Sequence, residues 1–139
     1  MENNKIKLKS ISSSDHKFLF DLLQERDSKI NISHKRMPTW EEHVKFIKSK
    51  PYSKWYVIQN KDKKIGSLYL SKQNEIGIHL LKKFEKESIH LESIKKLMSL
   101  NPEITFRANV SPTNKNYITL FKKLGFKMVQ HTYELDLRT

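Results

Sequence analysis

The sequence contains no cysteine in its 139 residues, which excludes disulfides, zinc–thiolate sites, iron–sulfur clusters and cysteine nucleophiles. No apolar run approaches the roughly 18–20 residues that a membrane-spanning helix needs. Residues 1–5 lack the apolar stretch of a secretory signal, and no metalloprotease motif or Ser-His-Asp arrangement is recognisable. We therefore expect a cytoplasmic protein with no membrane span and no metal site.

Arginine is also scarce, although the chain is strongly basic. The formal net charge is +12, yet only four of the 27 basic residues are arginine. A basic surface favours polyanions such as nucleic acid, anionic lipid headgroups or phosphorylated cofactors. Specific DNA readers rely on arginine for bidentate base contacts, and the lysines here are scattered along the chain. This balance argues against a nucleic-acid partner.

The apolar content is that of one ordinary domain. Hydrophobic residues make up 37% of the chain and charged residues 30%, which suits a packed core rather than a disordered tail. Strand and helix patterns alternate without a linker rich in proline, glycine or serine. We therefore predict a single domain that spans residues 1–139.

The first two thirds of the chain predict a strand, two helices and three further strands. Residues 5–9 alternate polar and apolar side chains, and a helix follows up to Arg26. A loop over residues 27–38 leads to a second helix, which begins with a capping box at Thr39 and is closed by Pro51. Short polar turns then join the expected strands, which must be antiparallel neighbours; these strands cover residues 54–59, 65–70 and 75–81.

After Leu81 the apolar period changes from two to about 3.6, which predicts a helix that stops at Asn101-Pro102. Residues 104–110 alternate as a strand, another helix ends at Gly125, and residues 126–137 form the last expected strand. The element order is β-α-α-β-β-β-α-β-α-β. A strand–helix–strand step in the middle implies one parallel pair in an otherwise antiparallel sheet. The predicted class is therefore α+β.

A helix that starts directly after a strand presents backbone N–H groups and the positive end of its dipole to an anion. The stretch that follows Leu81 could play this part. It has no glycine, which a diphosphate normally requires for close backbone approach, and it carries two carboxylates, Glu85 and Glu87. Three lysines in the same stretch (Lys82, Lys83 and Lys86) partly offset them.

The order of elements and several motifs resemble the GNAT superfamily of acyl-CoA-dependent N-acetyltransferases, over nearly the whole chain. The most specific part is the run at residues 108–114 (Ala-Asn-Val-Ser-Pro-Thr-Asn), which continues through Leu120-Phe121 to Leu124-Gly125-Phe126. Residues 74–78 look like the family's fourth strand, which lines the active site. The resemblance implies a mixed, mostly antiparallel sheet with helices on both faces and one splayed parallel strand pair.

Two features depart from the family pattern. Glu85, Lys86, Ser88 and His90 stand where a Gln or Arg and three small residues usually form the pyrophosphate loop. Phe121 replaces the Tyr that in many members protonates the departing thiolate, and a phenyl ring cannot donate that proton.

If the chain is catalytic, an amine attacks a thioester directly and needs a base within one water of it. Glu75 is the first candidate, because by resemblance it matches a frequent base position; the alternative is a strand carboxylate paired with a lysine. Glu75, Gly77 and His79 share one face of their strand, so a Glu–His relay is an option. His34, in the loop between the first two helices, is the second candidate base.

The resemblance also suggests which residues contact the two substrates. Acetyl-CoA, expected as co-substrate without a metal, would be held by the end of the fourth strand, the following turn, two asparagines near the last helix and that helix itself. The amine acceptor would meet the loop after the first helix and a group of aromatic residues. The cofactor set is Leu80, Leu81, Lys82, Glu85, Lys86, Glu87, Ser88, Ile89, His90, Asn109, Asn114, Asn116 and Phe121, and the acceptor set is Asn31, Ser33, Lys35, Tyr52, Trp55 and Tyr69.

The leading hypothesis is therefore acetyl transfer from acetyl-CoA to a primary amine of a small molecule, for example an amino sugar, by a monomer or homodimer. The alternative is a GNAT-fold binding module that has lost catalysis, which the glycine-free turn and Phe121 motivate.

Overall fold

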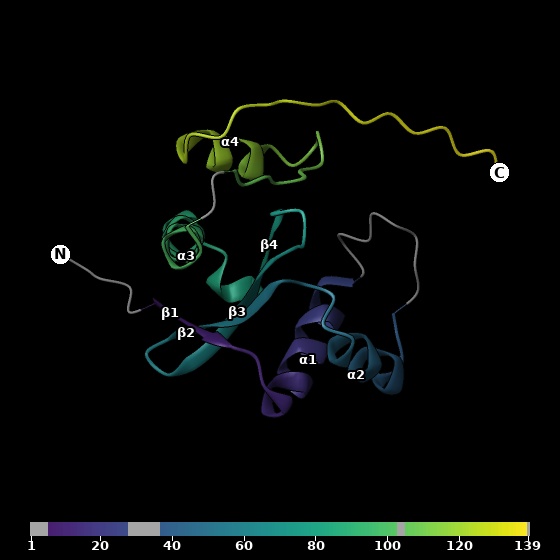
Figure 1. Cartoon of the computed structure of the whole chain (residues 1–139), viewed down its shortest axis with the longest axis vertical. Coiled ribbons are helices and arrows are strands. Elements are labelled where there is room, and N and C mark those ends of the chain that lie inside the picture. Colours follow the sequence, from purple (N-terminus) through teal and green to yellow (C-terminus); the bar gives the residue numbers. More distant parts are fainter. Residues whose placement is uncertain (1–5, 28–36, 103–104, 139) are drawn as a thin grey trace. The chain divides into compact units, whose positions relative to one another are not determined.

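The computed structural model describes residues 6–27, 37–102 and 105–138. It divides into two compact units, Met1–Asn109 and Val110–Thr139, and each is described by itself. The second unit holds one helix, α4 (Lys115–Lys123). The elements of the first unit are β1 (Ile6–Ser10), α1 (His16–Asp27), α2 (Trp40–Lys48), β2 (Lys54–Asn60), β3 (Lys63–Leu70), β4 (Ile76–Leu80) and α3 (Glu87–Leu100), with short 3-10 turns at Ser13–Asp15 and Lys82–Phe84 (Figure 1).

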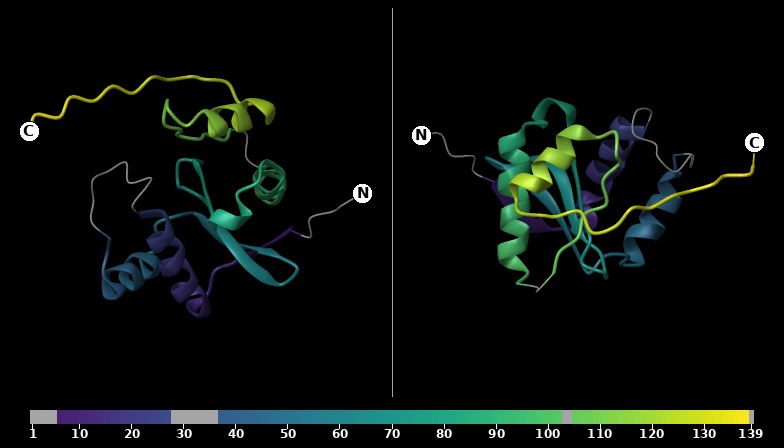
Figure 2. Two further views of the ribbon diagram at one scale, coloured as in Figure 1. Left: turned by 180° about the vertical axis from the view of Figure 1, so that it is seen from behind. Right: turned by 90° about the horizontal axis from the view of Figure 1, so that it is seen from above.

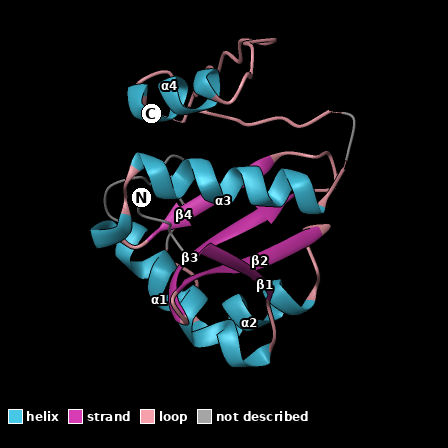
Figure 3. Ribbon diagram, turned by 90° about the vertical axis from the view of Figure 1, so that its left-hand side faces the viewer, coloured by secondary structure: helices cyan, strands magenta, loops and turns pink. Residues whose placement is uncertain are grey.

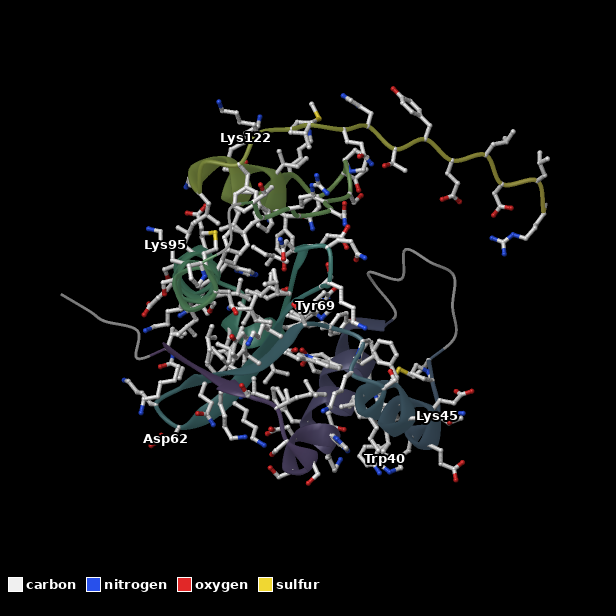
Figure 4. The ribbon with its side chains drawn as sticks, in the orientation of Figure 1. Trp40, Lys45, Asp62, Tyr69, Lys95 and Lys122 are labelled. Atoms are coloured by element: carbon white, nitrogen blue, oxygen red, sulfur yellow. The ribbon has the colours of Figure 1, made fainter. Side chains whose placement is uncertain are left out.

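The four strands form an antiparallel sheet in the order β1-β2-β3-β4. Lys61 and Asp62 have φ angles of 53° and 68° at the tight β2–β3 turn, a conformation that twists with the strands. In Figure 4, Asp62 marks this tip and Tyr69 lies toward the opposite end of the strand pair. The register pairs Trp55 with Tyr69 and Tyr69 with Gly77, so these three positions lie side by side across three strands.

One face of the sheet packs against α3, and the other against α1 and α2 (Figure 3). On the α3 side, strand residues with alternate spacing are buried against one apolar stripe of the helix. The Asn101 side chain, at the end of α3, donates to the Tyr56 hydroxyl at 3.1 Å and to the carbonyl of Leu97 at 2.9 Å. The buried apolar residues of this layer include Ile58, Leu68, Leu70, Ile76, Ile78, Leu80, Ile89, Ile94 and Leu97.

The opposite face is covered by α1 and α2, which lie side by side (Figure 2). Thr39 caps α2 in the capping box that the sequence predicts: its hydroxyl accepts from the N–H of Glu42, and the Glu42 carboxylate accepts from the N–H of Thr39. The His43 ring lies 3.2 Å from the carbonyl of His16 and thereby ties α2 to the start of α1. Leu19, Leu22 and Ile47 are the buried apolar residues that these two helices contribute.

A charged group is buried at the start of α1. The Asp15 side chain has no exposed surface. Its carboxylate accepts from the Lys9 ammonium at 3.0 Å and forms an ion pair with the Lys64 ammonium at 2.7 Å. The N–H of Ser12 also donates to it at 2.8 Å. Burial raises the pKa of Asp15, but the hydrogen bonds from Lys64, Lys9 and Ser12 outweigh it and lower this pKa to about 2. The ionised Asp15 therefore links the start of α1 to Lys9 in β1 and to Lys64 in β3.

The last two strands that the sequence predicts are not formed in the described residues. Of the stretch at 104–110, only Arg107 pairs, in an isolated parallel bridge with Glu75. Residues 126–138 form no strand, and their large apolar side chains from Met128 onward are exposed; Tyr133 has 88% of its surface accessible. An alternating pattern specifies which face a strand would bury, but it does not specify the partner strand.

In the second unit, the Asn114 side chain caps α4 by accepting from the N–H of Tyr117 at 3.2 Å. Gly125 ends the helix with a φ of +96°, in the left-handed conformation that the sequence predicts there. Leu120 and Phe121 are buried, and the Phe121 ring meets that of Phe126 edge to face at 5.1 Å.

Candidate active site

Glu75 stands immediately before β4, where the antiparallel sheet meets the parallel bridge. The N–H of Ile76 donates to the carbonyl of Arg107 at 2.7 Å, and the N–H of Arg107 donates to the carbonyl of Asn74 at 2.9 Å. On the other side, the N–H of Ser71 donates to the carbonyl of Glu75 at 2.8 Å. Glu75 is thus fixed between the end of β3 and the segment around Arg107, and the predicted parallel pair is reduced to this bridge.

The Glu75 carboxylate is half-buried and held from two directions. The Ser71 hydroxyl donates to one oxygen at 3.2 Å, and the Asn109 amide donates to the other at 3.2 Å. Among the described residues no lysine pairs with this carboxylate. The lysine-paired alternative therefore finds no partner within residues 6–27, 37–102 and 105–138. Asn109, expected in the strand at 104–110, is an exposed residue outside any strand, and its amide orients Glu75.

Four aromatic side chains line the same sheet face and the adjoining part of α2. Tyr52 and Tyr69 stack with ring centroids 3.8 Å apart and 5° between the planes. Trp55 meets Tyr52 edge to face at 4.8 Å, and Phe46, 47% exposed on α2, meets both of them. The Trp55 indole donates to the Ser67 hydroxyl at 2.8 Å. Phe46, Tyr52, Trp55 and Tyr69 are called the aromatic layer below.

Gly77 lets the aromatic layer reach β4. A Cβ atom at position 77 would overlap the phenol end of Tyr69, including its hydroxyl oxygen. The Tyr69 phenol therefore occupies the space that a side chain at position 77 would fill, on the face of β4 that also carries Glu75 and His79. A glycine is needed at this point for close approach.

His79 lies at the far end of β4 from Glu75, and its ring meets the Tyr69 ring at 6.5 Å. Four residues along a strand span about 13 Å, so a direct Glu75–His79 proton relay does not fit this geometry. The Tyr69 phenol lies between the two positions. A catalytic role for His79 itself stays a prediction.

The turn between β4 and α3 is the candidate diphosphate site. The N–H of Leu81 donates to the carbonyl of Ile65 in β3, and the N–H of Lys82 donates to the Glu25 carboxylate at 2.9 Å. At the helix start, Lys86 gives no side-chain cap. The first-turn N–H groups of α3, around Ser88, are thus not covered by the side chain that precedes them.

His90 occupies one of the positions where the family has a small residue, but it does not cover the helix end. Its side chain is buried, at 6% exposure, and its Nδ1 lies 3.0 Å from the carbonyl of Lys86. With His90 turned into the core and a small serine at position 88, neither side chain covers the main chain at the start of α3.

Burial lowers the pKa of His90, although the hydrogen bond to Lys86 and the charges of Glu85 and Glu87 oppose this. The folded state therefore favours neutral His90, and the stability it contributes is lost as the pH falls below 6.5 toward the lower folded pKa. We expect His90→Asn to reduce the difference in denaturant midpoint between pH 7 and pH 5. The matched control is His131→Asn, at an exposed position, and an equal reduction in both variants would contradict this assignment.

The lysines of this turn do not all face one point. The Lys83 ammonium lies 5.6 Å from the centre of the Phe84 ring, and Lys63, from the β2–β3 turn, lies 5.5 Å from the same centre. Glu85, Lys86, Glu87 and Ser88 are exposed around the start of α3, whereas Leu80 and Ile89 are buried in the core. The side chains of Leu80 and Ile89 thus belong to the core, and only their main chain is left to contact a cofactor.

Several predicted site residues cannot be placed in the site. His34, Asn31, Ser33 and Lys35 lie outside the described residues. Asn114, Asn116 and Phe121 belong to the second unit, where Asn114 is the α4 cap and Phe121 packs on Phe126.

Three residues of the site region carry no clear signal in the sequence: Ser71, Glu25 and Phe46. Ser71 binds both the carboxylate and the N–H of Glu75. Its neighbours in sequence form a polar turn, so the pattern does not single it out. Glu25 lies 57 residues from its partner Lys82, and such a contact needs tertiary structure.

No group of three or more His, Cys, Asp or Glu side chains in the described part of the chain is arranged to hold a metal ion. Among the described helices, none has the length and apolar content needed to cross a membrane.

Solved structures share this arrangement of strands and helices along nearly the whole chain. A domain from Methanocaldococcus jannaschii DSM 2661 superposes with a TM-score of 0.81 at 24% identity, over 95% of this chain and 94% of that one. An N-acetyltransferase from Staphylococcus aureus Mu50 gives 0.73 at 14% identity, over 88% and 84%. RimL, a ribosomal L7/L12 α-N-acetyltransferase in complex with coenzyme A, gives 0.71 at 17% identity, over 88% and 79%.

The chain has a GNAT-like fold, which it shares with these N-acetyltransferase structures. The resemblance predicted from the sequence is thereby confirmed at the level of the fold. No family model matches the sequence, and no curated protein matches it significantly. Within the GNAT fold, Glu75, the aromatic layer and the start of α3 all belong to the first unit.

Proposed function

We propose that the chain is an N-acetyltransferase that moves the acetyl group of acetyl-CoA to a primary amine of a small molecule. The observation that carries this proposal is the Glu75 carboxylate, held by Ser71 and Asn109 at the parallel bridge and accompanied on its sheet face by the aromatic layer. A half-buried carboxylate with a fixed orientation and an exposed side is suited to accept a proton from an amine.

The proposed roles follow from position. Glu75 accepts the proton of the attacking amine, directly or through one water. The first-turn N–H groups of α3 bind the diphosphate of acetyl-CoA, and Lys82 and Lys86 add positive charge around it. Tyr52, Trp55 and Tyr69 offer the acceptor partly exposed aromatic surface, which suits a sugar ring and supports an amino sugar as the acceptor.

A GNAT-fold binding module without catalysis is the second candidate, and a specific observation favours it. The start of α3 has no glycine, carries Glu85 and Glu87, and has the N–H of Lys82 already bound by Glu25. These groups oppose a tightly bound diphosphate through charge repulsion and loss of one donor.

Calorimetric titration of acetyl-CoA into the protein, with CoA lacking the acetyl group as the second titrant, separates the two candidates. We expect micromolar binding of acetyl-CoA, followed by acetyl transfer in a screen of amino sugars, polyamines and amino acids. Absence of binding at millimolar acetyl-CoA would overturn the acetyltransferase and leave the binding module.

A further inference from the structure

Phe121 cannot supply a proton, so an acetyltransferase built on this chain needs another acid for the departing sulfur. The candidate acid must lie on the same face as the base, at a distance that leaves room for the reacting carbon between them. Tyr69 meets this description within the first unit, and this inference rests on the proposed function.

The Tyr69 hydroxyl is placed by its surroundings. Its phenol end lies against the main chain of β4 at Gly77, at the position of the missing side chain. The stack on Tyr52 at 3.8 Å holds the ring in this plane, and the His79 ring bounds it at the far side. Within the described part of the chain, the hydroxyl makes no hydrogen bond, and Tyr69 is partly exposed. A fixed donor that has no acceptor among the described residues is available to a ligand.

The spacing to the base is also suitable. Glu75 and Gly77 lie two residues apart on one strand face, which corresponds to about 6–7 Å. A proton acceptor for the amine and a proton donor for the leaving group act on opposite sides of the same carbon, so they must be several ångströms apart.

We propose that Tyr69 is the catalytic acid, and that its hydroxyl donates a proton to the thiolate sulfur while Glu75 takes the proton of the amine. The amine nitrogen bonds to the thioester carbon, and the carbon–sulfur bond breaks with its electron pair on sulfur. Tyr69 gives its proton to that sulfur, so free CoA leaves as the thiol. Water then returns a proton to the Tyr69 oxygen and removes the one on Glu75, and both groups regain their starting state.

The test measures ionisation of the thiol of bound CoA, which requires no acceptor. Thiolate absorbance is followed against pH for CoA bound to the full chain, with the desulfo-CoA complex as the reference that subtracts protein absorbance. A hydroxyl donor stabilises the thiolate, so the wild-type complex should ionise at lower pH than the Tyr69→Phe complex. The expected difference is about tenfold in the ionisation constant, as for a hydrogen bond to a charged atom.

Tyr56→Phe is the matched control, because it removes the same hydroxyl from the opposite face of the sheet; its ionisation curve should match that of the wild type. With an amine found in the acceptor screen, Tyr69→Phe should lower kcat by about 10²-fold and leave the KM for acetyl-CoA nearly unchanged. Equal thiol ionisation in wild type and Tyr69→Phe overturns the role of Tyr69. If CoA binds neither the wild type nor the two variants, the proposed function is overturned instead.

Discussion

Replacing Glu75 by Gln is expected to lower kcat by about 10²–10⁴-fold, which is the range for loss of a positioned general base. The amide has nearly the shape of the carboxylate but cannot accept the proton of the amine. The affinity for acetyl-CoA should be unchanged, because the carboxylate is held by Ser71 and Asn109 rather than by the turn before α3. Steady-state rates and calorimetry on the same preparation check both statements.

Asp62→Asn is the matched control for this change. It also removes one carboxylate, but at the tip of the β2–β3 hairpin (Figure 4), and it should leave kcat unaltered. Equal turnover of Glu75→Gln and the wild type would show that Glu75 is not the base. In that case His34, the second candidate from the sequence, would be the next residue to replace.

Asp15→Asn should lower the free energy of unfolding by about 3 kcal/mol at pH 7, the lower end for a buried ion pair that loses one partner. The change removes the charge that Lys9 and Lys64 share in the core. Because the folded pKa of about 2 lies below the ordinary value of 3.8, the stabilisation is complete above pH 3.8 and is lost as the pH falls toward 2. Urea denaturation of both proteins across this range measures it.

Asp21→Asn provides the control for surface charge. Asp21 forms an ion pair at 3.1 Å with Lys17, four residues earlier on the exposed surface of α1. Such pairs contribute about 0.5 kcal/mol or less to the free energy of unfolding. If Asp15→Asn and Asp21→Asn cost the same, Asp15 does not act as a buried anchor, and its low pKa has no consequence for folding.

Much of the first unit is predictable from the sequence, because its signals are local. The capping box at Thr39, the helix stop at Asn101 and the two hairpins depend on neighbouring residues. Each appears, and the strand ends of the hairpins lie within two residues of those predicted. The end of the chain shows the limit of the same approach. Residues 126–137 alternate as a strand should, yet the pattern contains no information about which strand they would pair with.

The candidate site shows the same limit: one of its residues could be predicted from local sequence, but the contacts between distant segments could not. Glu75 could be singled out as a candidate from its place before a strand and its resemblance to a known motif, whereas its partners could not. The Ser71 hydroxyl and the Asn109 amide reach Glu75 across a turn and from another segment. The position of the Tyr69 hydroxyl depends on the absence of a side chain at Gly77 in the neighbouring strand, which only the register reveals.

The close fit of Tyr69 over Gly77 also limits how this sequence can diverge. A methyl group at position 77 would displace the phenol and separate it from the Tyr52 ring, so substitutions at 69 and 77 are not independent. A descendant with alanine at 77 keeps the sheet but must accept a smaller or shifted residue at 69. At Gly66 a Cβ atom would instead collide with the carbonyl oxygen of His79, and no neighbouring side-chain change can relieve a clash with the main chain. Gly77 can therefore be replaced if residue 69 changes with it, whereas no change of a neighbouring side chain makes a substitution at Gly66 possible.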